Sequence, residues 1–250
     1  MTATDRPRTG KLAVALAAAT MLVLAPAAYA QDTGGTDASG PDPGITGGTS
    51  AESSGPLSLV VKPAAMYGRV VHFRGFADPS YVGRAIRIER YDLNAGWTTV
   101  ARARIRPSTR FLARWRTDHI GHFWVRVVVT GRKSTGLAAQ ALSWPMAQVT
   151  VYRPVIATWY GPGFYGRRTA CGGRLTPTTL GIAHPKLACG TLVDVTYRGR
   201  SVTIPVVDHG PYANNASFDL TAAAAAALGM RSTARIGAVS ARARLSAPPQ

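Results

Sequence analysis

Short runs of β-forming residues alternate with Gly and Pro along most of this chain, and this pattern leaves little room for helices. Gly (26) and Pro (17) are plentiful among the 250 residues. Both residues interrupt helices, and both mark the turns at which strands end. A helix-period pattern appears only after residue 221, in the Ala run 222–227. The sequence therefore predicts an all-β fold with one short Ala-rich helix.

Residues 1–30 have the organisation of an export signal. A basic start precedes an apolar core from Leu12 to Ala25, and Ala28-Tyr29-Ala30 forms a small-residue cleavage motif. The alternative is a membrane anchor, but the apolar run is short for a membrane span. We therefore expect a secreted, extracytoplasmic protein, associated with the cell wall, with no stable membrane span after cleavage.

Two segments offer almost nothing to bury. Residues 31–57 consist mainly of Gly, Ser, Thr, Asp and Pro, a composition typical of a disordered linker. Residues 246–250 form a loose tail by the same argument. Folded structure is expected between these two segments.

Residues 58–152 predict an antiparallel β-sandwich. Six strand-like runs recur with turn residues between them, at 59–61, 70–73, 85–91, 97–105, 111–115 and 123–130. Their order resembles bacterial Ig-like or fibronectin-like modules. In 86–91 and 101–106, Arg alternates with apolar residues, which gives one basic face. That face is either an ordinary solvated sheet surface or a docking surface for an anionic wall polymer.

The formal net charge of +17 favours acidic partners. Nucleic acid, an anionic membrane and an anionic cell-wall polysaccharide all qualify by charge alone. Export makes nucleic acid an unsuitable partner, so peptidoglycan or another anionic cell-wall polysaccharide is expected. We expect the protein to act as a monomer.

Residues 153–245 predict a second β domain. The segments 192–197 and 201–207 indicate a hairpin, although Pro205 within the second strand cannot donate to a ladder. Asp219-Leu220-Thr221 opens the Ala-rich helix, and either Asp219 or Thr221 can cap it. Cys171 and Cys189 are the only cysteines, and an even pair in an exported protein predicts a disulfide.

Asp208 draws attention because it ends the apolar run 202–207 and is followed by a His-Gly-Pro turn. A carboxylate is thereby set where a sheet gives way to a surface loop. After Arg153 the only other acids are Asp219 and Asp194. Asp194 alternates along a strand and is expected to face solvent. Asp208 could alternatively be a turn former that bonds its own backbone.

Four motifs carry a family resemblance. TWYGPGFYGRRTACGG, GIAHPKLACGT, VVDHGPY and FDLTAAAAAALG occur in this order within residues 158–229. Together they resemble the RlpA (rare lipoprotein A) family, and they are similar to the N-terminal barrel of expansins. The resemblance implies a six-stranded double-psi β-barrel. It also implies lytic transglycosylase activity on peptidoglycan, whereas expansins bind and loosen wall polysaccharide without clear hydrolysis.

The resemblance assigns residues to roles. The acid of the D-x-G-P motif falls on Asp208, the helix-opening acid on Asp219, and the A-H histidine on His184. One departure concerns Gly173, where many family members carry a Glu that is implicated in catalysis. The lipid-attachment Cys of the family is absent too.

Lytic transglycosylation can be performed by one carboxyl group. The group first protonates the leaving oxygen and then accepts the proton of the attacking C6 hydroxyl of the sugar. Burial must hold its pKa high, and the surrounding Arg residues oppose this. Asp208 is the expected acid/base.

The remaining site residues are assigned more simply. Candidate sugar-binding residues are Trp159, Tyr160, Tyr212 and His209, although core packing would explain the aromatic residues equally well.

Two functions from different classes follow. The first is an exported lytic transglycosylase that cleaves MurNAc–GlcNAc bonds in peptidoglycan. The second is a noncatalytic, expansin-like protein that binds or loosens wall polysaccharide, a reading favoured by Gly173 and the high Arg content. A secreted inhibitor is a third possibility without a dedicated motif. No cofactor or metal site is indicated, because two cysteines and a nearby His184 do not make a zinc site.

Overall fold

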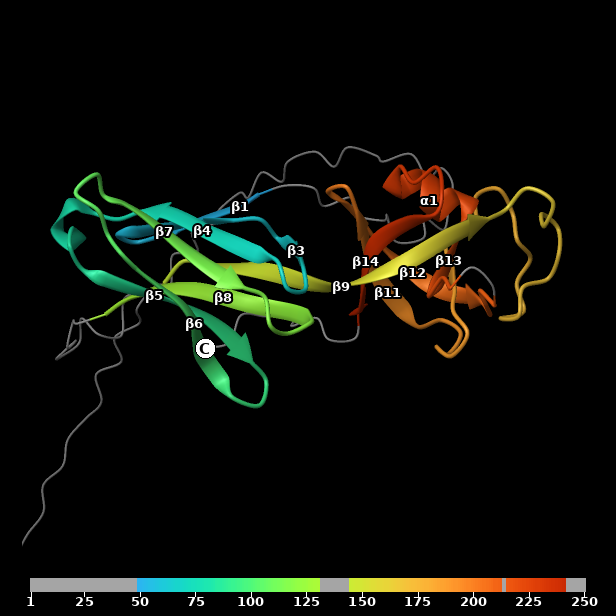
Figure 1. Ribbon diagram of the computed structural model, residues 1–250, viewed down its shortest axis with the longest axis horizontal. Coiled ribbons are helices and arrows are strands. Elements are labelled where there is room, and N and C mark those ends of the chain that lie inside the picture. Colours follow the sequence, from blue (N-terminus) through green and yellow to red (C-terminus); the bar gives the residue numbers. More distant parts are fainter. Residues whose placement is uncertain (1–48, 131–143, 213–214, 242–250) are drawn as a thin grey trace, which may run out of the picture. The chain divides into compact units, whose positions relative to one another are not determined.

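The computed structural model describes residues 49–130, 144–212 and 215–241. Strands dominate these residues, with one α-helix and one short 3₁₀ helix, η1 (Pro79–Tyr81) (Figure 1). The expected signal peptide, most of the linker and the tail lie outside the described residues. Within the described part of the chain, no helix is both long and apolar enough to span a membrane.

Two sheets form the N-terminal half. The first has the order β1-β2-β4-β7, with β1 (Ser50–Ser54), β2 (Leu57–Val61), β4 (Val70–Phe76) and β7 (Arg110–Arg116). The second contains β6 (Gly96–Arg104), β5 (Ala85–Asp92), β8 (Gly121–Val129) and β9 (Met146–Tyr160), and β3 (Ala64–Met66) pairs with β9. Strand β1 lies inside the segment 31–57, so the end of the expected linker is structured.

Alternating residues of both sheets share one apolar core. In β4 the odd-numbered residues are buried and the even-numbered ones exposed, and β7 follows the same rule, apart from half-buried Leu112, with Phe111 and Trp115 inside. Ile86 and Val127 of the second sheet belong to the same buried cluster. Two sheets that face each other across one core are a β-sandwich, as predicted. The likeness to Ig-like modules stays a prediction.

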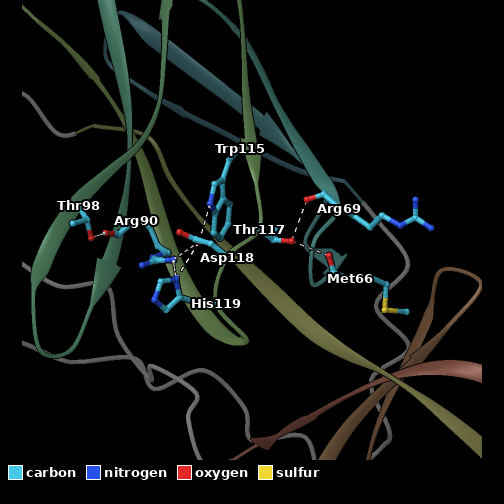
Figure 2. A network of polar contacts seen from close by, with 8 residues as sticks. All are labelled: Met66, Arg69, Arg90, Thr98, Trp115, Thr117, Asp118 and His119. Atoms are coloured by element: carbon cyan, nitrogen blue, oxygen red, sulfur yellow. Dashed lines mark hydrogen bonds and ion pairs between the residues drawn. The ribbon is translucent and has the colours of Figure 1, made fainter.

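The alternation expected along β5 stops at a bulge between Ile88 and Glu89. Beyond it Glu89 and Arg90 are both buried, so this strand does not present one continuous Arg face. Arg90 donates to Asp118 at 2.9 Å and lies beside His119 at 3.0 Å, while the Trp115 indole donates to Asp118 at 3.2 Å (Figure 2). A network of hydrogen bonds around the buried Arg90 guanidinium thus fixes the start of the loop after β7.

The same loop is tied down at a second point. The Thr117 hydroxyl lies within hydrogen-bonding distance of the carbonyl oxygens of Met66, at 2.9 Å, and of Arg69, at 3.0 Å (Figure 2). These bonds connect the end of β7 to the turn between β3 and β4. Hydrogen bonds from a side chain to the backbone therefore hold the loop after β7, in addition to the hydrogen bonds between strands.

Six strands close the C-terminal barrel. Their order is β13-β10-β12-β11-β14-β9, and β13 also pairs with β9. The new members are β10 (Ile182–Ala183), β11 (Leu192–Tyr197), β12 (Arg200–Asp208), β13 (Phe218–Thr221) and β14 (Ala234–Ser240). The pairs β10–β12 and β13–β9 are parallel and the others antiparallel. The closed six-stranded barrel confirms the predicted fold class. Strand β9 runs through the expected domain boundary at 152/153 without a break.

The predicted hairpin of β11 and β12 is present, and its two strands pair antiparallel. Pro205 is tolerated because the parallel pairing of β12 with β10 begins only at Val206. The expectation that Asp194 faces solvent is wrong. It pairs with Thr203 across the hairpin, is 3% exposed, and accepts a hydrogen bond from the Thr203 hydroxyl at 2.5 Å. Alternation alone misplaces this residue because both faces of β11 are covered.

Helix α1 (Ala222–Leu228) begins after β13. The Thr221 hydroxyl accepts from the backbone N–H of Ala224, and Gly229 ends the helix in the left-handed conformation. Thr221 rather than Asp219 is therefore the cap. Asp219 belongs to β13, which leaves its carboxylate free for another role.

Replacement of Gly237 by Ala should destabilise the barrel by roughly 1–3 kcal/mol, the usual cost of overpacking. A Cβ at this position would lie 2.6 Å from the Tyr152 Cβ and 2.7 Å from the Thr196 Cγ2. Denaturant unfolding measures the change. The matched variant Gly173→Ala should cost nothing, because its Cβ would meet only the Thr169 hydroxyl at 3.7 Å. Equal losses in both variants would contradict the packing argument.

Candidate functional site

An open groove of about 540 Å³ lies where β9, β12 and β13 end. Both remaining carboxylates of the barrel, Asp208 and Asp219, line it. Aromatic, small and hydroxyl side chains complete the wall; the lining residues are Thr158, Trp159, Tyr160, Phe164, Ala183, Asp208, His209, Gly210, Pro211, Tyr212, Asp219 and Thr233. Six of the predicted site residues therefore line one groove: Trp159, Tyr160, Asp208, His209, Tyr212 and Asp219.

Asp208 is the last residue of β12 and is held by three donors. Its Oδ1 accepts from the backbone N–H groups of Ala170, at 2.8 Å, and His209, at 2.9 Å. Its Oδ2 accepts from the Tyr160 hydroxyl at 3.4 Å. The bond from His209 is the local turn contact that the sequence offered as an alternative to function. The other two donors come from distant segments, so Asp208 is oriented by the tertiary structure as well.

Asp219 lies in β13 opposite Thr158 of β9, its register partner in the parallel pair. The Thr158 hydroxyl donates to Asp219 Oδ1 at 2.7 Å. Burial raises the pKa of the Asp219 carboxyl; the Thr158 bond lowers it in part, and the charge of Asp208 raises it again. Burial in the groove therefore favours the protonated form of Asp219.

The Tyr160 phenol interacts electrostatically with both groove acids. Burial raises the pKa of its phenol, and the charges of Asp208 and Asp219 raise it further. The phenol therefore stays protonated and remains a donor to Asp208. Its ring packs edge-on against Phe164, with the ring centroids 6.2 Å apart. Tyr160 is in this sense a positioning residue rather than an exposed sugar platform.

Other aromatic rings of the groove are open to solvent. Trp159 is 38% exposed, Phe164 50% and Tyr212 83%. Exposed rings beside carboxylates are the arrangement that stacks on the apolar faces of sugars. Phe164 was not predicted from the sequence, although it lies in the same GPGFYG stretch as the quoted aromatic motif.

The predicted disulfide is present, since the sulfurs of Cys171 and Cys189 are bonded. It ties the loop that contains Ala170, a donor to Asp208, to the segment that leads into β11. Among the described residues, the one group of three potential metal ligands consists of these two cysteines and His209. Its sulfurs are already bonded to each other, so they are not thiolate ligands.

His184 does not line the groove. Its Nδ1 accepts from the backbone N–H groups of Lys186, at 3.1 Å, and Leu187, at 2.9 Å. Its ring lies 4.8 Å from that of Phe218. Burial lowers the pKa of His184, and the charge of Lys186 lowers it further. These contacts describe a neutral histidine that stabilises a turn, whereas His209 does line the groove.

Sequence reasoning missed two partners of the acids, Thr158 and Ala170. Thr158 could have been found only from the pairing of β13 with β9, since the two residues are 61 positions apart in sequence. Ala170 acts through its backbone, which no side-chain motif reports. Gly173, where the family resemblance expects Glu, is exposed and close to Thr169.

The raised pKa of Asp219 predicts a pH-dependent effect of Asp219→Asn on stability. The native parent disfavours ionisation of this group, so its contribution is fully present below the unfolded-state pKa and is lost as the pH rises through the folded-state pKa. The Asn variant has no group that ionises at this position, so it does not lose this stability as the pH rises. Its unfolding free energy, relative to the parent, should therefore rise between pH 3 and pH 7, as measured by denaturant titration at each pH.

Asp78→Asn provides a control of opposite sign. The Ser80 hydrogen bonds lower the pKa of exposed Asp78, so its contribution is present at neutral pH and is lost as the pH falls. The stability of this variant relative to the parent should fall, not rise, from pH 3 to pH 7. A pH-independent difference for Asp219→Asn would contradict the assignment.

The barrel matches a known family. Residues 153–241 match the family model described as "Lytic transglycolase". A Synechocystis protein named "Probable endolytic peptidoglycan transglycosylase RlpA" is 48% identical over 80 residues, which cover 31% of this chain and 25% of that protein. The Campylobacter jejuni protein named "Endolytic peptidoglycan transglycosylase RlpA" is 42% identical over 77 residues, covering 30% and 28%.

One solved structure is similar over the same share of the chain. The Streptomyces papain inhibitor is 26% identical, covers 34% of this chain and 92% of its own, and has a TM-score of 0.27. This chain spans only about a quarter of the length of the two RlpA relatives. The family match lies in the barrel: five of its strands, the C-terminal part of β9 and both groove acids fall within residues 153–241. Residues 153–241 therefore form a double-psi β-barrel that is similar to the matched part of the RlpA proteins.

Proposed function

We propose that this protein is a lytic transglycosylase that cleaves MurNAc–GlcNAc bonds within peptidoglycan strands. The observation that carries the proposal is the pair of carboxylates, Asp208 and Asp219, that line one open groove in different environments. Two acids held in unlike environments are the usual basis for assigning an acid and a base. The RlpA relatives support the substrate class.

The two acids divide the work according to their surroundings. Asp219, whose pKa burial raises, donates a proton to the glycosidic oxygen as the bond from that oxygen to C1 of MurNAc breaks. The C6 hydroxyl of the same sugar attacks C1, and Asp208 accepts its proton. The products are a 1,6-anhydro sugar end and a free hydroxyl, and no water is consumed. The sequence expectation gave both tasks to Asp208; burial of Asp219 is the reason for the division.

The surrounding residues prepare this reaction. The donors Ala170, His209 and Tyr160 fix the direction of the Asp208 carboxylate, which lowers the cost of organising it during the reaction. Trp159 and Tyr212 provide exposed rings for the sugar faces. His184 has a supporting role in this scheme, since it holds the turn after β10.

The cellular setting belongs to the proposal as well. A peptidoglycan substrate requires an extracytoplasmic protein, in agreement with the export signal that the sequence predicts for residues 1–30. The enzyme would act as a secreted monomer in contact with the wall, and the reaction described above requires no cofactor.

A noncatalytic, expansin-like role is the second candidate. Gly173 favours it, because this position lacks the acid that the family resemblance expects. The groove and its exposed rings would then bind wall polysaccharide without cleaving it. The two functions differ in their products, so digestion of purified sacculi separates them.

Asp208→Asn and Asp219→Asn should each reduce the release of anhydro-muropeptides from sacculi by roughly 10²–10⁴-fold, the usual contribution of a positioned acid or base. Mass spectrometry of the soluble fraction measures the products. Asp78→Asn, which removes an exposed carboxylate of the sandwich, should leave product release unchanged. Full release by the Asp208 variant, or none by the folded parent, would reject the catalytic proposal.

Gly173→Glu should raise the rate of product release by up to about tenfold, if a third carboxylate assists proton transfer as the family resemblance implies. The backbone accepts the change, because a Cβ would make only ordinary contact at 3.7 Å. Gly173→Gln is the matched control, with the same shape and no charge. An equal gain with Gln would show that the added bulk, rather than the carboxylate, causes the effect.

A further inference from the structure

Where β4 and β7 form it, the outer face of the first sandwich sheet is basic and carries no acid. On β7 the outward residues include Arg110, Arg114 and Arg116, and on β4 they include His72 and Arg74, all exposed. The strands β2, β4 and β7 contain no Asp or Glu. We call these five residues the β4–β7 basic face. Figure 1 shows β4 and β7 side by side in the sandwich.

The register brings the basic residues close together. His72 is paired with Arg114, and Val70 with Arg116. Residues two apart on one strand lie about 7 Å from each other on the same face, so Arg114 and Arg116 are neighbours. Like charges at such positions destabilise a sheet unless a counter-charge is supplied. A partner of negative charge would supply it.

The guanidinium groups of this face have no acidic partner among the described residues. Arg87, Arg90 and Arg126 of the second sheet are paired with Glu89 or Asp118. In contrast, within the described part of the chain, the side chains of Arg74, Arg110, Arg114 and Arg116 make no ion pair or hydrogen bond. Arg110 only stacks on the exposed Phe76 ring, with its guanidinium carbon 5.1 Å from the ring centroid. The N–H groups of these guanidinium side chains are therefore available to solvent or to a ligand.

We propose that the β4–β7 basic face binds a polyanion with a repeating phosphodiester backbone, of the poly(glycerol phosphate) type found in bacterial walls. A row of Arg forks matches successive phosphate groups, each of which accepts two parallel N–H bonds. Apolar groups between the charges, Phe76 and Leu112 among them, are available for the carbon atoms of the repeat. This site is separate from the carboxylate-lined groove and would retain the protein on the wall while the groove acts.

The test measures binding of the full chain to soluble poly(glycerol phosphate) by calorimetry at low salt. Arg114→Gln/Arg116→Gln should weaken binding about fivefold or more, given the usual strength of exposed ion pairs. Arg102→Gln/Arg235→Gln is the matched control, since it removes the same charge from exposed positions on β6 and β14. It should leave the affinity nearly unchanged, and an equal loss would show that net charge alone drives binding.

Further arms distinguish the chemistry of the ligand. Arg114→Lys/Arg116→Lys keeps the charge without the planar fork, so it should fall between the parent and the Gln variant. Polygalacturonate, anionic phosphatidylglycerol vesicles and duplex DNA, whose phosphodiesters are held on a rigid helix, should each bind more weakly than poly(glycerol phosphate) at equal charge concentration. Tighter binding of any of the three would overturn the assignment. The Gln and Lys double variants at Arg114 and Arg116 should both still release anhydro-muropeptides from soluble glycan strands. Failure of the docking site is therefore distinguishable from failure of the catalytic proposal.

Discussion

The parallel pairing of β13 with β9 is the contact on which the barrel and its groove both depend. It closes the six-stranded order, and it sets Asp219 directly opposite Thr158. Without this pairing the Asp219 carboxyl would have neither its donor nor the burial that raises its pKa. One pairing in a short strand therefore determines both closure of the barrel and the chemistry of one wall of the groove.

The second acid depends on a different kind of constraint. Asp208 is placed by the end of β12 and directed by donors from β9, from the loop after it and from its own turn. Its position and that of Asp219 come from separate segments, which explains how one small groove holds two carboxylates with unlike surroundings. The proposed division of acid and base tasks rests on this separation, since a single shared environment would treat both groups alike.

Much of this organisation could be predicted from local patterns. The strand runs, the hairpin of β11 and β12, the helix end at Gly229 and the disulfide all follow from residues close in sequence or from the only available cysteine pair. The failures share a physical reason. The bulge in β5 and the burial of Asp194 depend on partners across the sheets, which alternation along one strand does not report. The backbone donor at Ala170 leaves no trace in the side chains at all.

The cross-link between Cys171 and Cys189 has a consequence for the timing of function. Ala170, the donor that directs Asp208, is adjacent to one of the two bonded residues. Before oxidation, the segment that contains this donor lacks its covalent tether and samples more conformations. The acid at the end of β12 is then less firmly directed. If the protein has the proposed function, a newly made chain in a reducing compartment has an incompletely organised site, and oxidation of the cysteine pair after export completes it.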